Sequence, residues 1–262
     1  MQKAESLTFY KYQGTGNDFI IVDNRHELFN KSDTKRIAHL CDRKFGIGAD
    51  GLILLENDAT ADFRMVYFNS DGNESSMCGN GGRCIVAFAN KLGIIGTKAR
   101  FLCVDGYHDA KIADETVSIS MKDVEEIRNK PSYFFLNTGS PHHVQLVEEL
   151  KDYDVQSEGE RLRYGLYGRK GSNINFVQQM GANQFGIRTY ERGVEDETLS
   201  CGTGVTAVAI AMHHAKKADS NTIKITTQGG ELAVDFDEEN GGYKNICLSG
   251  PAEFVYKGEI KW

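Results

Sequence analysis

Two cysteines, Cys78 and Cys201, each stand in a glycine-rich turn before a run of small and apolar residues, in the segments SSMCGNGGRCIVAFAN and TLSCGTGVTAVAIAMHHA. The runs predict buried helices, because they are apolar nearly all round. The first N–H groups of a helix have no intrahelical partner, and the aligned peptide dipoles add about half a positive charge there. A thiol in that field ionises more easily, and glycines let backbone N–H groups face an anion. The pattern therefore predicts a thiolate beside an anion site.

Two such thiols indicate a specific reaction. If two halves of the chain pack about a pseudo-twofold axis, the thiols flank one bound molecule from opposite sides. One thiolate then removes a proton from a carbon, and the opposite thiol returns one on the other face, which inverts the configuration. Helix N-termini aimed at a neighbouring carboxylate stabilise the carbanion. Because no lysine stands in an evident pyridoxal-phosphate setting, we expect a site that is independent of cofactors.

The sequence contains an internal duplication. A shift of 123 residues places Cys78-Gly79-Asn80-Gly81 on Cys201-Gly202-Thr203-Gly204, and it also places Gly48-Ala49-Asp50 on Gly171-Ser172-Asn173. Several motifs aligned at one offset argue for two copies of one supersecondary plan. The halves meet near residues 120–130.

Short β-branched or aromatic runs bounded by Gly, Asn and Asp predict strands in both halves, for example GLILLE and NINFVQ. Helices are expected after each cysteine turn and over residues 33–43, where an apolar stripe follows a Ser-Asp start. The fold class predicted is α+β, with two structurally similar domains, residues 1–123 and 124–250. Each is a curved, mostly antiparallel sheet around a central helix.

The charge and composition of the sequence exclude some classes of partner. The formal charge of −7 comes without a basic cluster, which gives no footprint for nucleic acid. No apolar run reaches the length of about 18 residues that a membrane helix requires, and the first residues lack a signal-peptide core. None of the six cysteines forms a C-x-x-C pair, the spacing typical of zinc sites and of redox-active disulfides, so the sequence does not indicate either kind of site. We expect a cytoplasmic protein that acts on a small molecule.

The chain resembles diaminopimelate epimerases over nearly its whole length. The resemblance rests on a set of segments: KYQGTGNDFIIVD, DRKFGIGADGLILLE, FNSDGNESSMCGNGGRC, GSPHHV, GSNINFV, YERGVEDETLSCGTG and GPAEFVYKGEI. It implies an enzyme that interconverts LL- and meso-2,6-diaminopimelate for lysine biosynthesis without metal or pyridoxal phosphate. It also implies that residues 251–262 fold back onto the first domain, and that the protein is a homodimer with Tyr256 near the contact.

The resemblance also implies residue roles. Cys78 and Cys201 match the base and acid, and His142 and Glu191 match groups beside the reacting centre. Residues matched to substrate binding are Asn17, Asn69, Gly79, Asn80, Ser140, Asn173, Glu191, Arg192, Gly202 and Thr203. Arg192 can hold a carboxylate bidentately while Glu191 takes the ammonium group. Two positions depart from the family: Ser140 stands where many members have Asn, and Gly51 where many have Gln.

Other interpretations remain open. A single free cysteine is most often a small buried hydrophobe, which is the interpretation for Cys41, Cys84, Cys103 and Cys247. A proline-racemase-like or other cofactor-free racemase shares the two thiols but differs in the grip on the distal end of the substrate. A non-enzymatic amino-acid-binding or redox-sensing protein would use Cys78 and Cys201 as a switchable disulfide.

Overall fold

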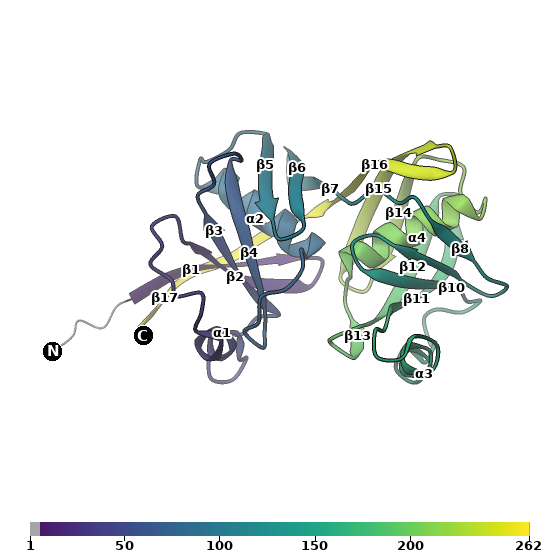
Figure 1. Ribbon diagram of the computed structural model, residues 1–262, viewed down its shortest axis with the longest axis horizontal. Helices are drawn as coiled ribbons and strands as arrows, with labels where there is room; N and C mark the ends of the chain where they lie inside the picture. Colours follow the sequence, from purple (N-terminus) through teal and green to yellow (C-terminus); the bar gives the residue numbers. More distant parts are fainter. Residues whose placement is uncertain (1–5, 262) are drawn as a thin grey trace. The chain divides into compact units, whose positions relative to one another are not determined.

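The computed structural model describes residues 6–261, and its elements fall into two compact units (Figure 1). The first unit runs to Ile119 and takes in the segment from Pro251 onward, and the second is Ser120–Gly250. Both mix strands with few helices, so the two-domain α+β class is confirmed.

The first unit contains seven strands before its boundary, two helices and one strand from the end of the chain. They are β1 (Ser6–Gly14), β2 (Asn17–Asp23), α1 (Thr34–Cys41), β3 (Gly51–Glu56), β4 (Phe63–Asn69), α2 (Gly79–Lys91), β5 (Lys98–Cys103), β6 (Gly106–Ala113), β7 (Thr116–Ser120) and β17 (Glu253–Lys261). β17 pairs antiparallel with β1, from Ser6 opposite Lys261 to Gln13 opposite Glu253. The second unit is therefore inserted into the first.

The second unit follows the same plan. Its elements are β8 (Ile127–Asn129), β9 (Phe134–Asn137), β10 (Pro141–Leu146), α3 (Val155–Tyr167), β11 (Asn173–Gly181), β12 (Gln184–Glu191), β13 (Asp196–Thr198), α4 (Gly202–His214), β14 (Thr222–Thr227), β15 (Gly230–Glu239) and β16 (Gly242–Pro251). α4 begins 123 residues after α2, and both helices have 13 residues. The element order thus repeats at the offset of the sequence motifs.

The pairing of strands follows from the connections between them. In the described part of the chain, four strand pairs are parallel: β2 with β3, β4 with β5, β10 with β11, and β12 with β14. A helix lies between the partners of each of these pairs, because a parallel pairing needs a long crossover. Neighbours joined by short turns, such as β3 and β4, are antiparallel.

Helix α2 lies at the centre of the first unit. It contacts β1, β2, β3, β4, β6 and β17, so strands surround it on several sides. Glycine makes this close packing possible: a Cβ on Gly81 would lie 3.0 Å from Ile53 Cδ1 and 3.3 Å from Met65 Cε. Helix α4 likewise contacts β9, β10, β11, β12, β14 and β15, and Val205 to Met212 are all buried. Burial on every face explains why these helices are apolar nearly all round.

Helices α1 and α3 instead cover the outer face of each sheet. Ile37, Leu40 and Cys41 of α1 pack in one cluster with strand residues such as Leu52 and Phe68. In the second unit, Val155 and Leu162 of α3 pack with Phe176 and Tyr190.

Helix α3 is an element that the sequence analysis missed. Asp154 caps it by accepting a hydrogen bond from the Ser157 N–H, but Gly159 and Gly165 interrupt its helical pattern. Gly159 is required by packing, since a Cβ there would lie 2.4 Å from Tyr190 Cβ. Gly165 has nothing within 4 Å of such a Cβ.

We expect these two glycines of α3 to respond oppositely to alanine. Gly159→Ala forces Tyr190 and the helix apart and destabilises the protein by about 1–3 kcal/mol. Gly165→Ala, the matched control, stabilises it by about 0.5–1 kcal/mol, because alanine is the better helix former in open space. Urea unfolding of both variants measures the difference. Equal effects of the same sign would show that the contact with Tyr190 does not constrain α3.

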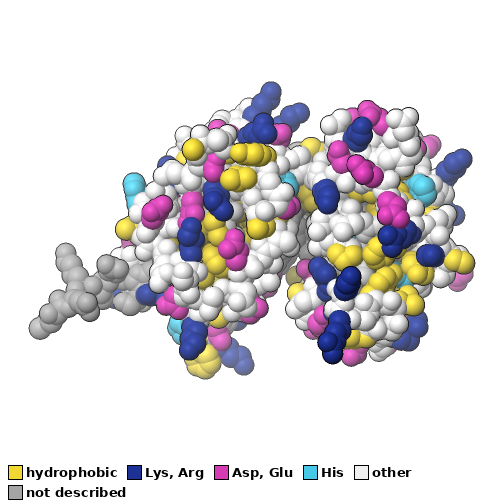
Figure 2. Space-filling model, in the orientation of Figure 1, with side chains coloured by type: hydrophobic (Ala, Val, Ile, Leu, Met, Phe, Trp, Pro, Cys, Tyr) yellow, Lys and Arg dark blue, Asp and Glu magenta, His cyan; other side chains and the backbone are white. Residues whose placement is uncertain are grey.

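The surface carries charges of both signs. On the face shown in Figure 2, basic and acidic side chains are interspersed. None of the helices among residues 6–261 is both long and apolar enough to cross a membrane.

Candidate active site

Cys78 and Cys201 are the N-cap residues of the two central helices. Their backbones are alike, with φ −103° and ψ 119° at Cys78 and φ −123° and ψ 109° at Cys201. The first intrahelical bonds run from Gly82 N–H to the Cys78 carbonyl (2.7 Å) and from Val205 N–H to the Cys201 carbonyl (2.9 Å). The three N–H groups that follow each cysteine therefore lie outside the intrahelical ladder. Each thiol thus stands beside donors suited to an anion.

The Cys78 thiol lies among amide side chains. Its Sγ is 3.6 Å from Asn17 Oδ1, and Asn80 Nδ2 donates to the same oxygen at 3.3 Å. Asn17 Nδ2 donates to Asp50 Oδ2 at 2.6 Å, which fixes the orientation of the Asn17 amide, since a carboxylate can only accept. Asp50 was not among the residues selected from the sequence, although the duplication offset aligns it with Asn173.

A network of ion pairs holds the residues next to Asn17 in place. Arg43 bonds both Asp18 (2.6 Å) and Asp50 (2.7 Å), and Lys11 bonds Asp18 at 2.7 Å. Burial alone would raise the pKa of Asp18, but hydrogen bonds from Arg43 and Lys11 outweigh it and lower the pKa to about 2. Asp18 is therefore charged at neutral pH, and the turn that carries Asn17 is firmly held.

Arg83 is a fully buried cation one turn into α2, with no solvent exposure. Its Nη2 donates to Asn80 Oδ1 (3.1 Å) and Thr15 Oγ1 (3.3 Å), and its Nε donates to the Pro251 carbonyl (3.3 Å). Because a guanidinium can only donate, Arg83 fixes the amide of Asn80 with its oxygen inward and its Nδ2 toward Asn17.

The Cys201 thiol lies in a second hydrogen-bonded cluster. Cys201 is 7% exposed, and its Sγ is 3.5 Å from Thr203 Oγ1. Thr203 Oγ1 is in turn 2.9 Å from His142 Nε2, and His142 Nδ1 is 3.2 Å from Asn175 Nδ2. His142 thus reaches the thiol through Thr203. Asn175 was missed in the sequence analysis because it stands in an ordinary strand pattern, NINFVQ.

His142 is neutral at physiological pH. It is fully buried, and burial, with the nearby charge of Arg192, lowers the pKa of its imidazole from 6.5 to about 3. Asn175 Nδ2 also donates to the His143 carbonyl at 2.7 Å, so the amide nitrogen faces His142 and must donate to Nδ1. Asn173 Nδ2 also lies 3.5 Å from Nε2, but the Asn175 contact is shorter, and it favours the tautomer with the proton on Nε2, directed at Thr203.

This depressed pKa predicts a pH dependence of stability. Below pH 6.5 the unfolded chain protonates His142 while the folded protein does not until about pH 3, so the unfolding free energy falls as pH decreases through that range. His142→Gln should remove a slope of up to about 1.4 kcal/mol per pH unit. His143, whose pKa burial lowers to about 4, contributes in both proteins, so the difference between wild type and variant isolates His142. Urea unfolding at several pH values from 4 to 7 measures the unfolding free energy of both proteins. The same pH dependence in wild type and variant would contradict the prediction.

Asn173, Glu191 and Arg192 lie together at the end of β12. Asn173 Oδ1 accepts from the Arg192 N–H at 2.8 Å, and Glu191 Oε2 accepts from the Thr198 hydroxyl at 2.9 Å. The Arg192 side chain is exposed, and its Nη1 donates to the Lys170 carbonyl at 3.1 Å.

An ion pair between a buried arginine and a half-buried glutamate holds the loop that follows. Arg163 of α3 is 6% exposed and bonds Glu195 Oε1 at 3.0 Å. Glu195 Oε1 also accepts from the Gly193 N–H (3.1 Å), and the Glu195 N–H donates to the Glu191 carbonyl (2.8 Å). Arg163 and Glu195 thereby fix the turn that bears Glu191 and Arg192. Neither was selected from the sequence.

The remaining expected residues lie at element ends. Asn69 ends β4 with an exposed side chain, and its N–H donates to the Asn73 carbonyl at 3.0 Å. Ser140 is half-buried, and its carbonyl accepts from the Thr138 N–H at 3.2 Å. At the departure Gly51, a Cβ would lie 2.5 Å from both the Phe68 carbonyl oxygen and the Tyr67 ring. Glycine at this position is thus a packing requirement.

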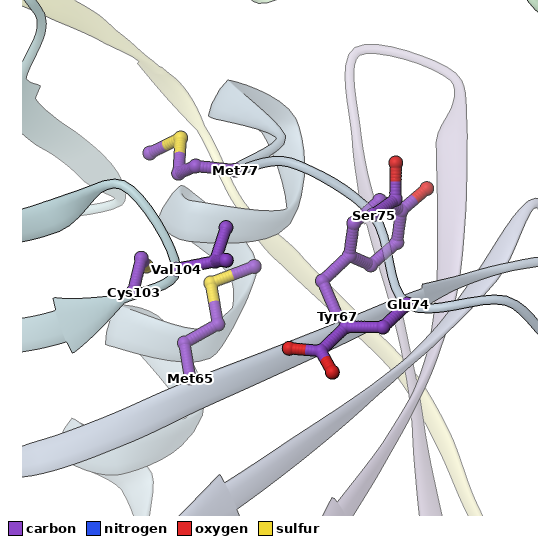
Figure 3. A pocket seen from close by; sticks show the side chains of 7 residues that line it. All are labelled: Met65, Tyr67, Glu74, Ser75, Met77, Cys103 and Val104. Atoms are coloured by element: carbon purple, nitrogen blue, oxygen red, sulfur yellow. The ribbon is translucent and has the colours of Figure 1, made fainter.

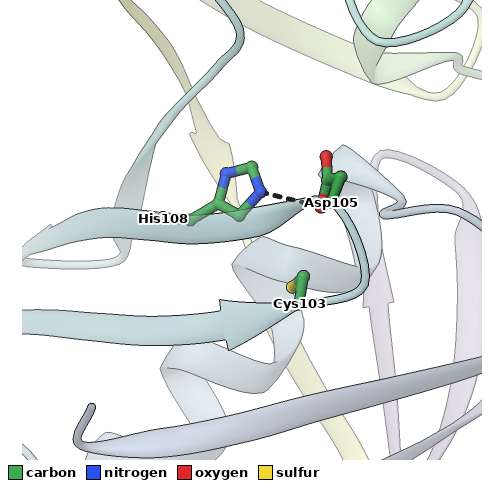
Figure 4. A group of neighbouring side chains, drawn as sticks. All are labelled: Cys103, Asp105 and His108. Carbon is green, nitrogen blue, oxygen red and sulfur yellow. Dashed lines mark hydrogen bonds and ion pairs between the residues drawn. The ribbon is translucent and has the colours of Figure 1, made fainter. Parts of the chain in front are cut away.

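One group of side chains has ligand types that could suit a metal. Ligand atoms of Cys103, Asp105 and His108, at the β5–β6 turn, lie within 4.8 Å of one another (Figure 4). His108 Nε2 pairs with Asp105 Oδ1 at 3.1 Å, and the Cys103 thiol is buried, which raises its pKa and disfavours the thiolate that metals bind. The geometry is that of a turn held by a hydrogen bond between His108 and Asp105 over a core cysteine.

A small pocket lies beside this turn and holds none of the expected site residues. Figure 3 shows its lining: Met65, Tyr67, Glu74, Ser75, Met77, Cys103 and Val104. Ser75 and Met77 belong to the segment that leads into Cys78, so the pocket lies behind the cysteine turn.

Comparisons with known proteins give matches over nearly the whole chain. A family model described as diaminopimelate epimerase matches residues 9–126 and 134–255. The diaminopimelate epimerase of Flavobacterium psychrophilum is 60% identical over 256 residues, covering 97% of this chain and 100% of the relative. That of Chlorobaculum tepidum is 42% identical, covering 94% and 98%.

Solved structures with the same fold are more distant in sequence. A phenazine biosynthesis protein of the PhzF family from Bacillus anthracis aligns with a TM-score of 0.79 at 14% identity, covering 98% of this chain and 100% of that chain. A hydroxyproline epimerase from Agrobacterium vitis aligns with a TM-score of 0.74 at 14% identity, covering 100% and 94%. At this identity the match concerns the fold.

Proposed function

Because the chain belongs to the diaminopimelate epimerase family, we propose that Cys78 and Cys201 are the acid and base with which it interconverts LL- and meso-2,6-diaminopimelate. The protein is an isomerase of lysine biosynthesis. One observation carries the assignment of the thiols: each is the N-cap of a buried central helix, in nearly the same backbone conformation. Cys41, Cys84 and Cys103 are buried cysteines without such a position.

In the proposed reaction, one thiolate takes the α-proton and the other thiol gives a proton to the opposite face of the carbon. The sulfur that takes the proton becomes a thiol, and the sulfur that gives one becomes a thiolate, so the net charge is unchanged. The α-carboxylate accepts from N–H groups at the two helix starts, Gly79 and Asn80 on α2 and Gly202 and Thr203 on α4. These donors are already fixed, so they stabilise developing charge without reorganisation.

The remaining site residues recognise the rest of the substrate. Arg192 pairs with the distal carboxylate and Glu191 with the distal ammonium group. Asn17, Asn69, Ser140 and Asn173 read the zwitterion, because amides and hydroxyls both donate and accept. The firm support of the Asn17 and Arg192 turns fits this role, since recognition of one configuration needs fixed groups. In this assignment His142 acts through Thr203 on the thiol.

The proposed chemistry needs neither metal nor pyridoxal phosphate, and we place the enzyme in the cytoplasm with diaminopimelate as its partner. The proline-racemase-like alternative has less support, since its solved relatives share the fold at low identity, whereas a diaminopimelate epimerase is 60% identical. The redox-sensor alternative requires that activity be absent.

Proton exchange tests the proposed function. LL-diaminopimelate incubated with the protein in D₂O, after dialysis against EDTA, should become meso isomer with deuterium at the α-carbon, read by NMR. Proline, supplied in parallel, should not exchange. Exchange on proline alone would favour the racemase alternative, and exchange on neither would remove the proposed activity.

We further propose a homodimer with Tyr256 at its contact. β17 exposes three neighbouring apolar side chains, Phe254 (41%), Val255 (53%) and Tyr256 (43%), which is unusual on a strand open to water. Tyr256→Glu should halve the mass measured by light scattering after size exclusion. Tyr107→Glu, which changes another exposed tyrosine (48%), should leave it unchanged. A monomeric mass for the wild type would contradict the proposal.

A further inference from the structure

The two thiols have hydrogen-bond partners of opposite polarity. At Cys78 the facing atom is an acceptor, Asn17 Oδ1 at 3.6 Å. At Cys201 the facing atom is a hydroxyl oxygen, Thr203 Oγ1 at 3.5 Å. Each sulfur either accepts or donates a hydrogen bond, depending on how its partner is oriented. That orientation is set by the side chains to which Asn17 and Thr203 are themselves hydrogen-bonded. The orientation at Cys78 can be traced to charged groups that cannot reverse, and the orientation at Cys201 to the tautomer of His142.

The partner of Cys78 is fixed as an acceptor from two sides. Asn17 Nδ2 faces the Asp50 carboxylate, which only accepts, so Asn17 Oδ1 must face the thiol. Asn80 Oδ1 faces the Arg83 guanidinium, which only donates, so Asn80 Nδ2 must donate to the same Asn17 oxygen. A sulfur that meets this oxygen has to donate. The cluster therefore favours Cys78 as a protonated thiol.

The partner of Cys201 is a donor in the tautomer of His142 that the Asn175 amide favours. The series of hydrogen bonds that leads to Cys201 starts at the His143 carbonyl. This carbonyl accepts from Asn175 Nδ2 and so turns that amide nitrogen toward His142 Nδ1. The remaining ring proton on Nε2 points at Thr203 Oγ1, 2.9 Å away, so that oxygen already accepts a bond. The Thr203 hydroxyl proton is then available for Cys201 Sγ. A sulfur that receives a hydroxyl proton is stabilised as a thiolate.

We infer that the substrate-free protein holds its single site proton on Cys78 and its negative charge on Cys201, with Thr203 as the positioning residue that keeps the thiolate. The inference rests on the proposed function for its meaning in catalysis, but the proton distribution exists without substrate. In the first half of a turnover Cys201 takes the α-proton and Cys78 releases its own. The product complex then carries the reverse distribution, which must reset before the next identical turnover.

Charged groups around the thiols define the competing effect. Arg83 and Cys84 lie on α2, and the charge of Arg83 acts on Cys78 in the sense opposite to the inference. Asp50 stands behind Asn17 and Glu253 of β17 acts on Cys84, and both carboxylates oppose Arg83. Near Cys201, His142 of β10 is neutral, and Arg192 after β12 is exposed to solvent. Cys201 is therefore the stronger acid of the two thiols if the hydrogen bonds at the thiols outweigh the effect of the Arg83 charge on Cys78.

Alkylation by iodoacetamide, followed at each cysteine by peptide mass spectrometry between pH 5 and 10, measures both thiols in one sample without substrate. We expect the midpoint of Cys201 to lie about 1–2 pH units below that of Cys78, the size of a hydrogen bond to a charged group. Thr203→Val should raise the Cys201 midpoint by a similar amount and leave Cys78 unchanged, whereas Thr203→Ser should keep it. Thr206→Val removes a buried hydroxyl that bonds the Gly202 carbonyl (3.0 Å) and should not move the midpoint.

The outcomes separate cleanly. A lower midpoint at Cys78 overturns the inference and shows that the Arg83 charge dominates. A folded Thr203→Val protein with an unchanged Cys201 midpoint also overturns it. If Thr203→Val does not fold, the order of the two wild-type midpoints decides alone. Because none of these readouts uses turnover, they stand apart from the D₂O test of the proposed reaction.

Discussion

Replacing either Cys78 or Cys201 with serine should lower kcat/KM for epimerisation of LL-diaminopimelate by about 10²- to 10⁴-fold, because a serine hydroxyl neither ionises near neutral pH nor replaces a thiol acid. Both N-cap positions accept serine without strain, since serine is a preferred cap. The helices and the substrate turns should therefore survive, and the loss should fall on the proton transfers.

A control variant distinguishes the loss of a catalytic thiol from a general loss of structure. Cys247→Ser changes a half-buried cysteine of β16 and serves as the control, with activity expected near wild type. Deuterium incorporation at the α-carbon, read by NMR for each variant, reports which proton transfer remains. Wild-type rates in either the Cys78 or the Cys201 variant would contradict the two-thiol assignment.

Glu195→Gln should destabilise the protein by about 2–4 kcal/mol, the second large effect. It leaves the Arg163 guanidinium, which is 6% exposed, without its carboxylate. It also weakens the acceptor of the Gly193 N–H, so the turn with Glu191 and Arg192 loosens and KM for diaminopimelate should rise. Urea unfolding gives the free energy, and steady-state kinetics gives KM.

A second substitution makes this prediction specific. Arg163→Met in the Glu195→Gln background should recover most of the lost stability, because it removes the unpaired charge and keeps apolar volume. Glu158→Gln on the same helix breaks an exposed pair with Arg161 and should cost less than about 1 kcal/mol. If the double variant is less stable than Glu195→Gln alone, the unpaired charge is not the cause of the loss.

Features encoded by short stretches of sequence could be predicted. The cysteine turns and the helices that follow them depend on adjacent residues, and α2 and α4 begin one residue after Cys78 and Cys201. The fold class followed from strand patterns repeated at one offset. Helix α3 was missed because Gly159, which its packing against Tyr190 requires, weakens the local helical signal.

Features that depend on distant residues could not be predicted. Asn17 and Asp50 meet because β2 and β3 pair in parallel across α1, and no local pattern indicates their contact. His142 meets Asn175 only through the register of β10 and β11, which places Val144 opposite Asn175. The sequence supplied the thiols, while the fold supplies the groups that orient them.

The pairing of β1 with β17 has a consequence for how the polypeptide folds. Ser6 and Lys261 are partners in one sheet, yet nearly the whole chain separates them. The inserted segment Ser120–Gly250 is a compact unit of its own, so it can fold as soon as it has left the ribosome. The first unit cannot complete its sheet until translation reaches β17. Folding order is thus set by topology: the part of the chain made first is the part finished last. Until then β1 is paired with β2 on one edge only, and its other edge is an open strand edge of the kind that promotes aggregation.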